Sequence, residues 1–171
     1  WFAVGLARDF GGNDQRVGAT RTAWDGTERK AARFVRWGTG FGCHYALGFV
    51  FDDAGDDTYR GDWACDAYGW DLGVGVICDA AGNDRYEVPG SGLAQAFNGA
   101  LAVLYDGAGD DSYLSAAPGQ AGATSEYHAG QQGAFNFSFL IDRQGKDQYS
   151  AGVTNQTETQ QGWAGGFIID R

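Results

Sequence analysis

The sequence has little of what specifies several common classes of protein. Its three cysteines, Cys43, Cys65 and Cys78, are too few for a disulfide framework and are interpreted first as small apolar residues. Lysine and arginine number 12 against 22 aspartates and glutamates, and the net charge of −10 would repel a phosphate backbone, so nucleic acid is not an expected partner. No run approaches the ~20 apolar residues of a membrane helix, and membrane insertion is not expected.

Proline is also scarce and methionine is absent, whereas glycine is abundant. The chain has 29 glycines in 171 residues, more than twice the usual share of about 7%. Glycine at this level without a collagen period indicates many tight corners or closely packed backbones. A hydrophobic content of 43% is sufficient for a core, so we expect a folded chain. Because it opens at Trp1 and stops within a repeated motif, we expect a fragment of a longer protein.

One motif, D-x-x-G-x-D-x-Y, recurs along the chain. Its copies are FDDAGDDTY from Phe51, CDAAGNDRY from Cys78, YDGAGDDSY from Tyr105 and IDRQGKDQY from Ile141, with a divergent RDFGGNDQR from Arg8 and a truncated IDR from Ile169. The first aspartates are Asp9, Asp52, Asp79, Asp106, Asp142 and Asp170, at spacings of 43, 27, 27, 36 and 28 residues. The spacings indicate a unit of about 27 residues with two insertions.

The residues before each motif alternate with a period of two. Two positions before the aspartate the residue is aliphatic, and four positions before it the residue is small, as Val50 and Gly48 illustrate. This alternation predicts a β-strand. Twenty-seven residues suit a three-sided coil, so we predict an all-β fold, a parallel β-solenoid (β-helix) of three-sided coils that forms a single domain over residues 1–171. A propeller blade would need about 40 residues or more.

The strand before each motif is apolar on both faces. We expect the small residues to face the narrow interior and the larger ones to face outward, although the reverse orientation is an alternative. The predicted outward residues are Phe49, Phe51, Val76, Val103, Tyr105, Phe137, Phe139 and Ile141. A strand that is apolar on both faces is normally covered on both. The pattern therefore predicts a docking face for a protein partner or for a second copy of the chain.

Two insertions interrupt the repeat. Residues 16–36 hold six of the twelve basic residues, and 27–36 are typical of a short helix capped by Thr27. This segment could be a basic patch for an anionic partner or simply a solvated face. Residues 116–127 are rich in alanine, glycine and serine and indicate a surface loop. His44 and His128 are isolated in the sequence and predict neither a zinc site nor a catalytic dyad.

Stacked motifs would place like-charged aspartates about 4.8 Å apart, where two carboxylates repel by roughly 0.9 kcal/mol even in water. Hydrogen bonds within the turn, with glycine supplying a positive φ, would compensate without metal. Calcium, which takes carboxylate and carbonyl oxygens, is the alternative. The tyrosines that close the motif, Tyr59, Tyr86, Tyr113 and Tyr149, predict an aromatic ladder, either as packing or as an exposed row that binds sugar.

The G-x-D element of the motif, as in Gly82-Asn83-Asp84, resembles the calcium-binding nonapeptide of the bacterial RTX β-roll. That resemblance implies calcium ligands at Asp14, Asp57, Asp84, Asp111 and Asp147. Lys146 departs from the acidic or amide residues at the equivalent positions. The wider pattern is similar to a group of bacterial repeat proteins that have such motifs and no known activity. This second resemblance implies a β-solenoid of bacterial origin and no catalytic residue.

We therefore expect a non-enzymatic structural or interaction module, located outside the cytoplasm (extracellular or in the cell envelope), that docks through its apolar face, with calcium as the alternative to turn hydrogen bonds in stabilising its corners. One alternative is a parallel β-helix that binds or degrades polysaccharide, with motif carboxylates as the acid and base. Another is a calcium-dependent adhesin, which would share the scaffold and require the metal.

Overall fold

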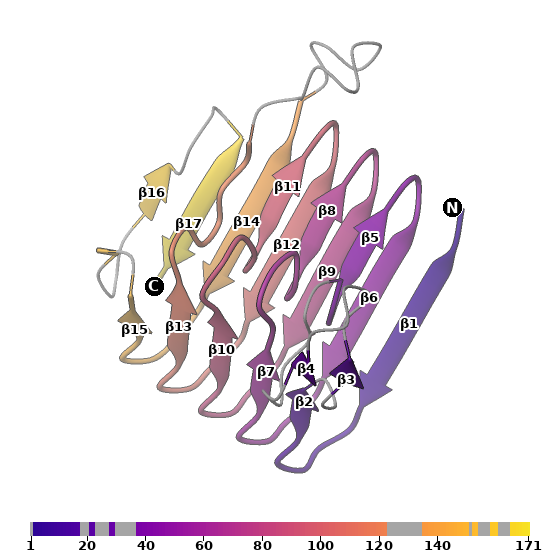
Figure 1. Ribbon diagram of the computed structural model, residues 1–171. Helices are drawn as coiled ribbons and strands as arrows, with labels where there is room; N and C mark the ends of the chain where they lie inside the picture. Colours follow the sequence, from indigo (N-terminus) through magenta and orange to yellow (C-terminus); the bar gives the residue numbers. More distant parts are fainter. Residues whose placement is uncertain are drawn as a thin grey trace.

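The computed structural model describes residues 2–17, 21–22, 28–29, 37–122, 135–150, 152–153, 158–160 and 165–171. These residues form strands and turns and no helix (Figure 1). Accordingly, the described part of the chain includes no helix capable of spanning a membrane. The prediction of an all-β fold is confirmed.

Three parallel sheets run along the molecule. The first sheet has the order β1 (Val4–Asp9), β6 (Leu47–Asp52), β9 (Val74–Asp79), β12 (Leu101–Asp106), β14 (Phe137–Asp142), β17 (Gly166–Asp170) and β16 (Glu158–Gln160). The second has the order β15 (Gln148–Tyr149), β13 (Ser112–Ser115), β10 (Arg85–Val88), β7 (Thr58–Arg60) and β2 (Gln15–Val17). The third contains β11 (Gln95–Phe97), β8 (Tyr68–Trp70) and β5 (Phe41–Cys43). Only the edge strand β16 pairs antiparallel within them.

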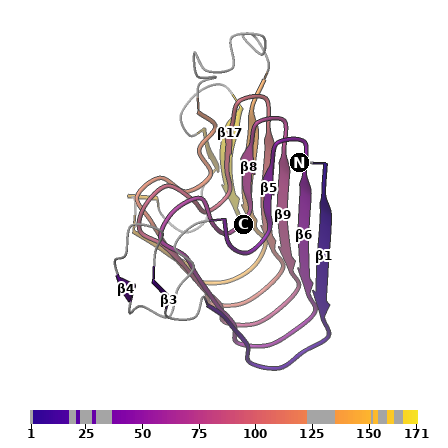
Figure 2. The same ribbon diagram turned by 45° about the vertical axis from the view of Figure 1, so that its right-hand side comes forward.

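A complete turn of the chain uses one strand from each sheet, as in β6, β7 and β8 before the chain returns to the first sheet at β9 (Figures 1 and 2). The register places Asp52 beside Asp79, and Asp79 beside Asp106. Equivalent residues of successive repeats therefore lie in columns along one axis. The predicted parallel β-solenoid with three-sided coils is confirmed.

The strands of the first sheet alternate between buried and half-buried residues. In β6, Gly48, Val50 and Asp52 are buried and face inward, whereas Leu47 and Phe49 are half-buried on the outer face. The small residues thus face the interior, as expected, and the reverse orientation is wrong. The reason is steric, because a Cβ on Gly48 would overlap the backbone carbonyl of Phe41 in β5. The third sheet lies so close to the first that only small side chains fit between them.

The wider part of the interior is filled by two parallel rows of side chains. One row is aliphatic and the other is the row of motif tyrosines, and both belong to one buried cluster that includes Ile77, Leu104, Tyr86 and Tyr113. The strand–turn–strand corner, where the motif aspartates lie, closes this end of the coil.

The predicted helical insertion lies mostly outside the described residues. Within it, Arg21–Thr22 (β3) and Glu28–Arg29 (β4) pair as antiparallel strands. For Glu28 and Arg29 the prediction of a helix is therefore wrong, since cross-strand backbone pairing holds these two residues extended. Of the loop insertion at 116–127, residues 123–127 lie outside the described part. Pro118, Gly119, Ala121 and Gly122 are buried, and Ala121 forms a parallel bridge with Ala96 of the third sheet, so the prediction of a surface loop is wrong for these residues.

The glycine of each motif is required by the neighbouring coil. Gly82 has φ +158° and a Cβ there would overlap the carbonyl oxygen of Gly55 in the preceding coil; Gly109 is in the same relation to Gly82. The corner backbones are stacked with no space for a side chain between them.

We predict that Gly82→Ala destabilises the protein by about 3 kcal/mol or more, because the added methyl group must displace a stacked backbone. Urea denaturation followed by circular dichroism measures the change. Gly5→Ala is the matched control, since a Cβ on Gly5 meets nothing within 4 Å and should change stability by less than about 1 kcal/mol. Equal stability of the two variants would contradict this account of the corner.

Candidate functional site

Each of the four corners between Asp52 and Asp147 buries two aspartates of the same motif, whereas Asp9 and Asp14 of the first corner are half-buried. The first, such as Asp79, is the last residue of a strand in the first sheet and faces inward by the alternation of that strand. The second, such as Asp84, comes five residues later, directly before the strand of the second sheet. Asp79 is 0% exposed and Asp84 is 2% exposed. Such burial is uncommon for a carboxylate and requires specific partners.

The second aspartates link successive coils by hydrogen bonds. The carboxylate of Asp84 accepts from the backbone N–H of Asp57 at 2.7 Å, and that of Asp111 accepts from the N–H of Asp84 at 2.6 Å. The same contact joins the N–H of Asp14 to Asp57 at 2.6 Å, and that of Asp111 to Asp147 at 2.8 Å. The predicted calcium ligands therefore form one continuous column in which each carboxylate holds the backbone of the preceding coil.

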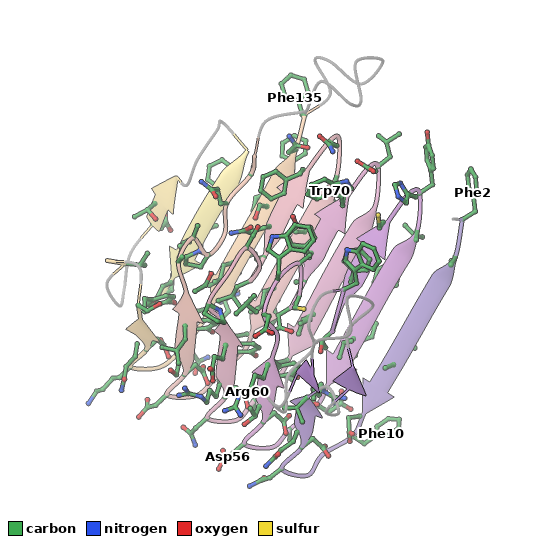
Figure 3. The ribbon with its side chains drawn as sticks, in the orientation of Figure 1. Phe2, Phe10, Asp56, Arg60, Trp70 and Phe135 are labelled. Carbon is green, nitrogen blue, oxygen red and sulfur yellow. The ribbon has the colours of Figure 1, made fainter. Side chains whose placement is uncertain are left out.

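A second column of hydrogen bonds runs along the exposed edge of the corners. In this column the N–H of the later coil donates to a side chain of the preceding coil, which is the reverse of the first column. The N–H of Asn83 donates to the side chain of Asp56 at 2.8 Å, and the N–H of Asp110 donates to the side chain of Asn83 at 3.0 Å. Lys146 is the last described residue of this column, and its backbone N–H donates to Asp110 at 3.0 Å. Asp56 points away from the body at this edge (Figure 3). Lysine is accommodated at this position because its bond to Asp110 uses the backbone N–H and not the side chain.

Hydrogen bonds within a single turn are a smaller part of the corner than predicted. Such bonds occur from the N–H of Gly11 to Asp9 at 3.1 Å and from the N–H of Gln144 to Asp142 at 3.2 Å. The second aspartates accept from the neighbouring coil instead, because their side chains point along the stack axis.

The motif tyrosines stack inside the solenoid. Ring centroids are 4.8 Å apart for Tyr59 and Tyr86, 5.1 Å for Tyr86 and Tyr113, and 4.8 Å for Tyr113 and Tyr149. The predicted aromatic ladder is confirmed. Tyr59, Tyr86 and Tyr113 are 0% exposed, so the hypothesis that these three rings bind sugar is wrong.

Each buried tyrosine hydroxyl donates to the first aspartate of the next coil. The distances are 2.7 Å from Tyr59 to Asp79 and 2.7 Å from Tyr86 to Asp106, and Tyr113 makes the same bond to Asp142. In the first coil, Arg16 is the residue aligned with Tyr59. Its guanidinium forms an ion pair with the buried carboxylate of Asp52 and lies over the Tyr59 ring.

The two aspartates of a corner and those of the next coil converge into clusters. Carboxylate oxygens lie within 4.8 Å of one another in the groups Asp9, Asp14 and Asp52; Asp52, Asp57 and Asp79; Asp84, Asp106 and Asp111; and Asp111, Asp142 and Asp147. Sequence reasoning proposed only the second aspartate of each motif as a ligand. The structure adds the first aspartates, which the repeat had already marked but which were interpreted as turn residues.

Burial, together with the charges of neighbouring aspartates, raises the pKa values of the buried carboxyl groups of Asp57, Asp79, Asp84, Asp106, Asp111, Asp142 and Asp147. Burial, followed by the charge of Asp106, raises the pKa of Asp111 to about 9. Burial raises the pKa of Asp84 to about 8 and that of Asp106 to about 7, although a hydrogen bond from Tyr86 opposes the rise at Asp106. In the absence of a bound cation, the cluster therefore holds protons at neutral pH.

The eight residues predicted for the docking face all lie on the outer side of the first sheet. The register aligns Phe49 with Val76, Val76 with Val103, and Val103 with Phe139. The side chains of this row are half-buried among their neighbours. No described segment covers this face, which is on the right in Figure 2.

A cluster of a different composition lies beside the third sheet and was not predicted. His44 Nδ1 lies 3.0 Å from the carboxylate of Asp71, and the thiol of Cys43 is in the same group, within 4.8 Å of both. Burial, followed by the charge of Asp71, raises the pKa of the Cys43 thiol to about 11, so by itself this thiol is not a thiolate nucleophile at neutral pH. His128 lies outside the described residues.

These three residues line a cavity of about 230 Å³ together with Trp37, Trp63 and Trp70. Trp70 lies on the outer surface of the third sheet, on the side facing the viewer in Figure 3. The sequence contains a signal for this cluster, because His44 and Asp71 are 27 residues apart and therefore belong to adjacent coils.

Comparison of the chain with protein-family models, with curated proteins and with solved structures gave no match. We therefore argue its function from its own residues.

We predict that stability falls as pH rises when calcium and other cations are removed with a chelator. The folded-state pKa values of about 6 for Asp79 to about 9 for Asp111 exceed the ~3.9 of an unfolded aspartate, so the folded chain holds protons that the unfolded chain releases. This stabilisation is complete below about pH 4 and is lost as pH rises through the folded-state values. The Tm should fall by about 10 °C or more between pH 5 and pH 9.

Asp106→Asn should weaken this pH dependence, because a neutral amide replaces a group that must otherwise stay protonated. Asp110→Asn, at the exposed edge of the corner, is the matched control and should leave the dependence unchanged. A Tm that rises between pH 5 and pH 9 in the wild-type chain would exclude protonated corners.

Proposed function

We propose that the chain is a non-enzymatic interaction module that associates, through the outer face of its first sheet, with the same face of a second copy. The observation that supports this is a sheet face that no described segment covers and that is made almost entirely of aliphatic and aromatic side chains. Two of the motif aspartates that a polysaccharide-degrading enzyme could use as acid and base, Asp84 and Asp111, are at most 2% exposed and cannot reach a polymeric substrate.

The distribution of charge singles out this face. The chain carries 22 acidic residues, yet among the described residues the strands of the first sheet place only two charged side chains on this face, Arg8 in β1 and Glu158 in the edge strand β16. Arg8 is itself paired with Asp53 at 2.9 Å. The chain could therefore be strongly acidic and still bring two copies of this face together without placing like charges between them.

The second sheet shows that an apolar outer face is not required by the fold. Its outward positions include Thr58, Arg60, Arg85 and Glu87, and Arg60 pairs with Glu87 at 3.1 Å. Both sheets have the same parallel stacking, but only the first presents an apolar exterior. Scattered apolar surface is normal, whereas a contiguous apolar patch marks a binding site.

The size of the face suits a dimer. Six parallel strands about 4.8 Å apart and about 20 Å long cover roughly 500 Å² in projection, and the relief of the side chains adds to this. A stable interface buries about 800 Å² per partner. Two such sheets pack face to face about 10 Å apart, and a two-fold axis brings the same patch of each copy into contact.

We predict that the purified chain is a dimer in solution and that Val103→Lys converts it to a monomer. Val103 is on the middle strand of the face, so the lysine would be buried without a partner charge, and the dimer Kd should rise by more than about 100-fold. Sedimentation equilibrium measures the association, and circular dichroism verifies the fold.

Leu114→Lys is the matched control. Leu114 is a half-buried, outward-facing residue on a strand of the second sheet, and its replacement should leave the dimer intact. A monomeric wild-type chain at concentrations of tens of micromolar, or equal effects of the two lysines, would refute association through this face.

We further propose that the corner clusters bind calcium. In the cluster of Asp84, Asp106 and Asp111, one oxygen each of Asp84 and Asp111 is buried and accepts no hydrogen bond from the described residues. Calcium prefers carboxylate and carbonyl oxygens in variable geometry. Its binding would neutralise carboxylates that otherwise must hold protons. We propose with it a location outside the cytoplasm, because extracellular modules are among the proteins that carry calcium sites.

We predict that calcium raises the Tm at pH 8 and has little effect at pH 5, where protons occupy the same oxygens. A ligand at 100 times its Kd that binds only the folded chain adds about 2.7 kcal/mol per site, which corresponds to several degrees. Differential scanning calorimetry with calcium or with a chelator measures the effect. The response should be reduced in Asp111→Asn and retained in Asp110→Asn. Identical melting curves with calcium and chelator at pH 8 would eliminate calcium.

A further inference from the structure

Beside the third sheet, two successive residues, Cys43 and His44, depart from the repeat, and both are of types that bind metal ions. The strands β5, β8 and β11 are aligned, so Cys43 occupies the position held by Trp70 and Phe97 in the next two coils. The residue after each strand continues the column as His44, Asp71 and Asn98. A repeat that only had to pack would need neither the thiol nor the imidazole.

Asp71 is held in place between its two neighbours in this column. Asn98 Nδ2 donates to Asp71 Oδ1 at 2.7 Å, and His44 Nδ1 lies 3.0 Å from Asp71 Oδ2. The side chain of Asp71 is 3% exposed and that of His44 is 34% exposed. The amide of Asn98 therefore orients the carboxylate and leaves its second oxygen directed toward His44. Neighbouring hydrogen bonds of this kind commonly fix the ligands of metal sites.

The separations suit a small tetrahedral cation. A zinc ion bound to nitrogen and oxygen at its usual distances of 2.0–2.2 Å holds those two atoms about 3.3 Å apart, close to the 3.0 Å between His44 and Asp71. The Cys43 sulfur lies within 4.8 Å of both ligand atoms. Sulfur and imidazole nitrogen are the ligands that favour zinc over calcium or magnesium.

The site is accessible from two sides. Cys43 and His44 line the aromatic cavity with Trp37, Trp63 and Trp70, and they also line a larger cavity of about 610 Å³ beside β1 and the Phe41–Gly48 segment. A cation held by three protein ligands keeps a fourth position for water or another small ligand. Here that position would open toward the cavities.

We propose that Cys43, His44 and Asp71 form a binding site for a zinc-type divalent cation with one exchangeable coordination position. This site is separate from the aspartate corners, which offer oxygen ligands only. It is also independent of the association of two copies, because its ligands lie on the side of the third sheet.

The test uses Co²⁺ as the probe, because a thiolate ligand gives a sulfur-to-cobalt charge-transfer band that carboxylates do not. The full 171-residue chain should bind one Co²⁺ with this band, and Zn²⁺ should displace it. Cys43→Ala should abolish the band and weaken binding by roughly 100-fold. Cys78→Ala, which removes another half-buried thiol, is the matched control and should keep the band.

His44→Asn is the second variant. It places at residue 44 the amide that Asn98 already supplies two coils on, so the column can keep its hydrogen bond to Asp71 while the metal ligand is lost. Co²⁺ binding should weaken by about the same factor as in Cys43→Ala, with an unchanged circular dichroism spectrum. A cobalt spectrum without the sulfur band, or a band that survives in Cys43→Ala, would overturn the proposal and leave His44 as a structural partner of Asp71.

Discussion

The stack of coils depends on the hydrogen bond between a buried aspartate carboxylate and the backbone N–H of the preceding coil. Backbone hydrogen bonds between coils continue through part of each corner, as from the N–H of Ala80 to Asp52 and from the N–H of Gly82 to Ala108. The N–H groups of Asn83 and Asp84, directly before the strand of the second sheet, donate to side chains instead. Carboxylates such as Asp84 and Asp111 supply the missing acceptors on the inside, and Asp56 and Asn83 supply them on the outside. A buried N–H without a partner would destabilise every coil.

This arrangement gathers like charges in an apolar interior, and the surrounding residues follow from the need to neutralise them. Tyr59 and Tyr86 donate hydroxyl hydrogens to first aspartates, which is why the motif closes with tyrosine and not phenylalanine. In the first coil, Arg16 takes the place of tyrosine and brings a positive charge to Asp52. Elsewhere protons must supply the positive charge, or a bound cation must. By linkage, stability should fall with rising pH when the corners hold protons, and the stabilisation by a bound cation should grow with rising pH.

Much of the fold could be predicted from the sequence because stacking turns chain distance into spatial position. The spacing of 27 residues gave the coil, and the alternation before each aspartate gave the inner and outer sides. The sequence did not reveal which way the aspartates point, because a carboxylate that accepts within its own turn and one that accepts from the next coil leave the same pattern. The tyrosines were predicted to stack, but whether their faces were buried depended on the width of the coil. The contact between His44 and Asp71 was not predicted, because both residues lie outside the D-x-x-G-x-D-x-Y motif, in the column directly after the strands of the third sheet.

The division of side chains between the inside and the outside also explains why the apolar face matters. Near the third sheet, the interior is so thin that a Cβ on Gly48 or Gly75 would overlap backbone carbonyls, so this part cannot hold large side chains. At the corner end, carboxyl groups and tyrosines fill the interior. Among the described residues, the larger apolar core is the column that includes Ile77 and Leu104 with the rings beside it, and a second buried cluster holds only the small side chains of Ala96, Ala100 and Ala102. A large share of the aliphatic and aromatic residues therefore lies on the outer face, where apolar area is worth about 25 cal/mol per Å² only once it is removed from water. In this solenoid, the association that we propose for that face would add the hydrophobic stabilisation that the narrow interior cannot provide.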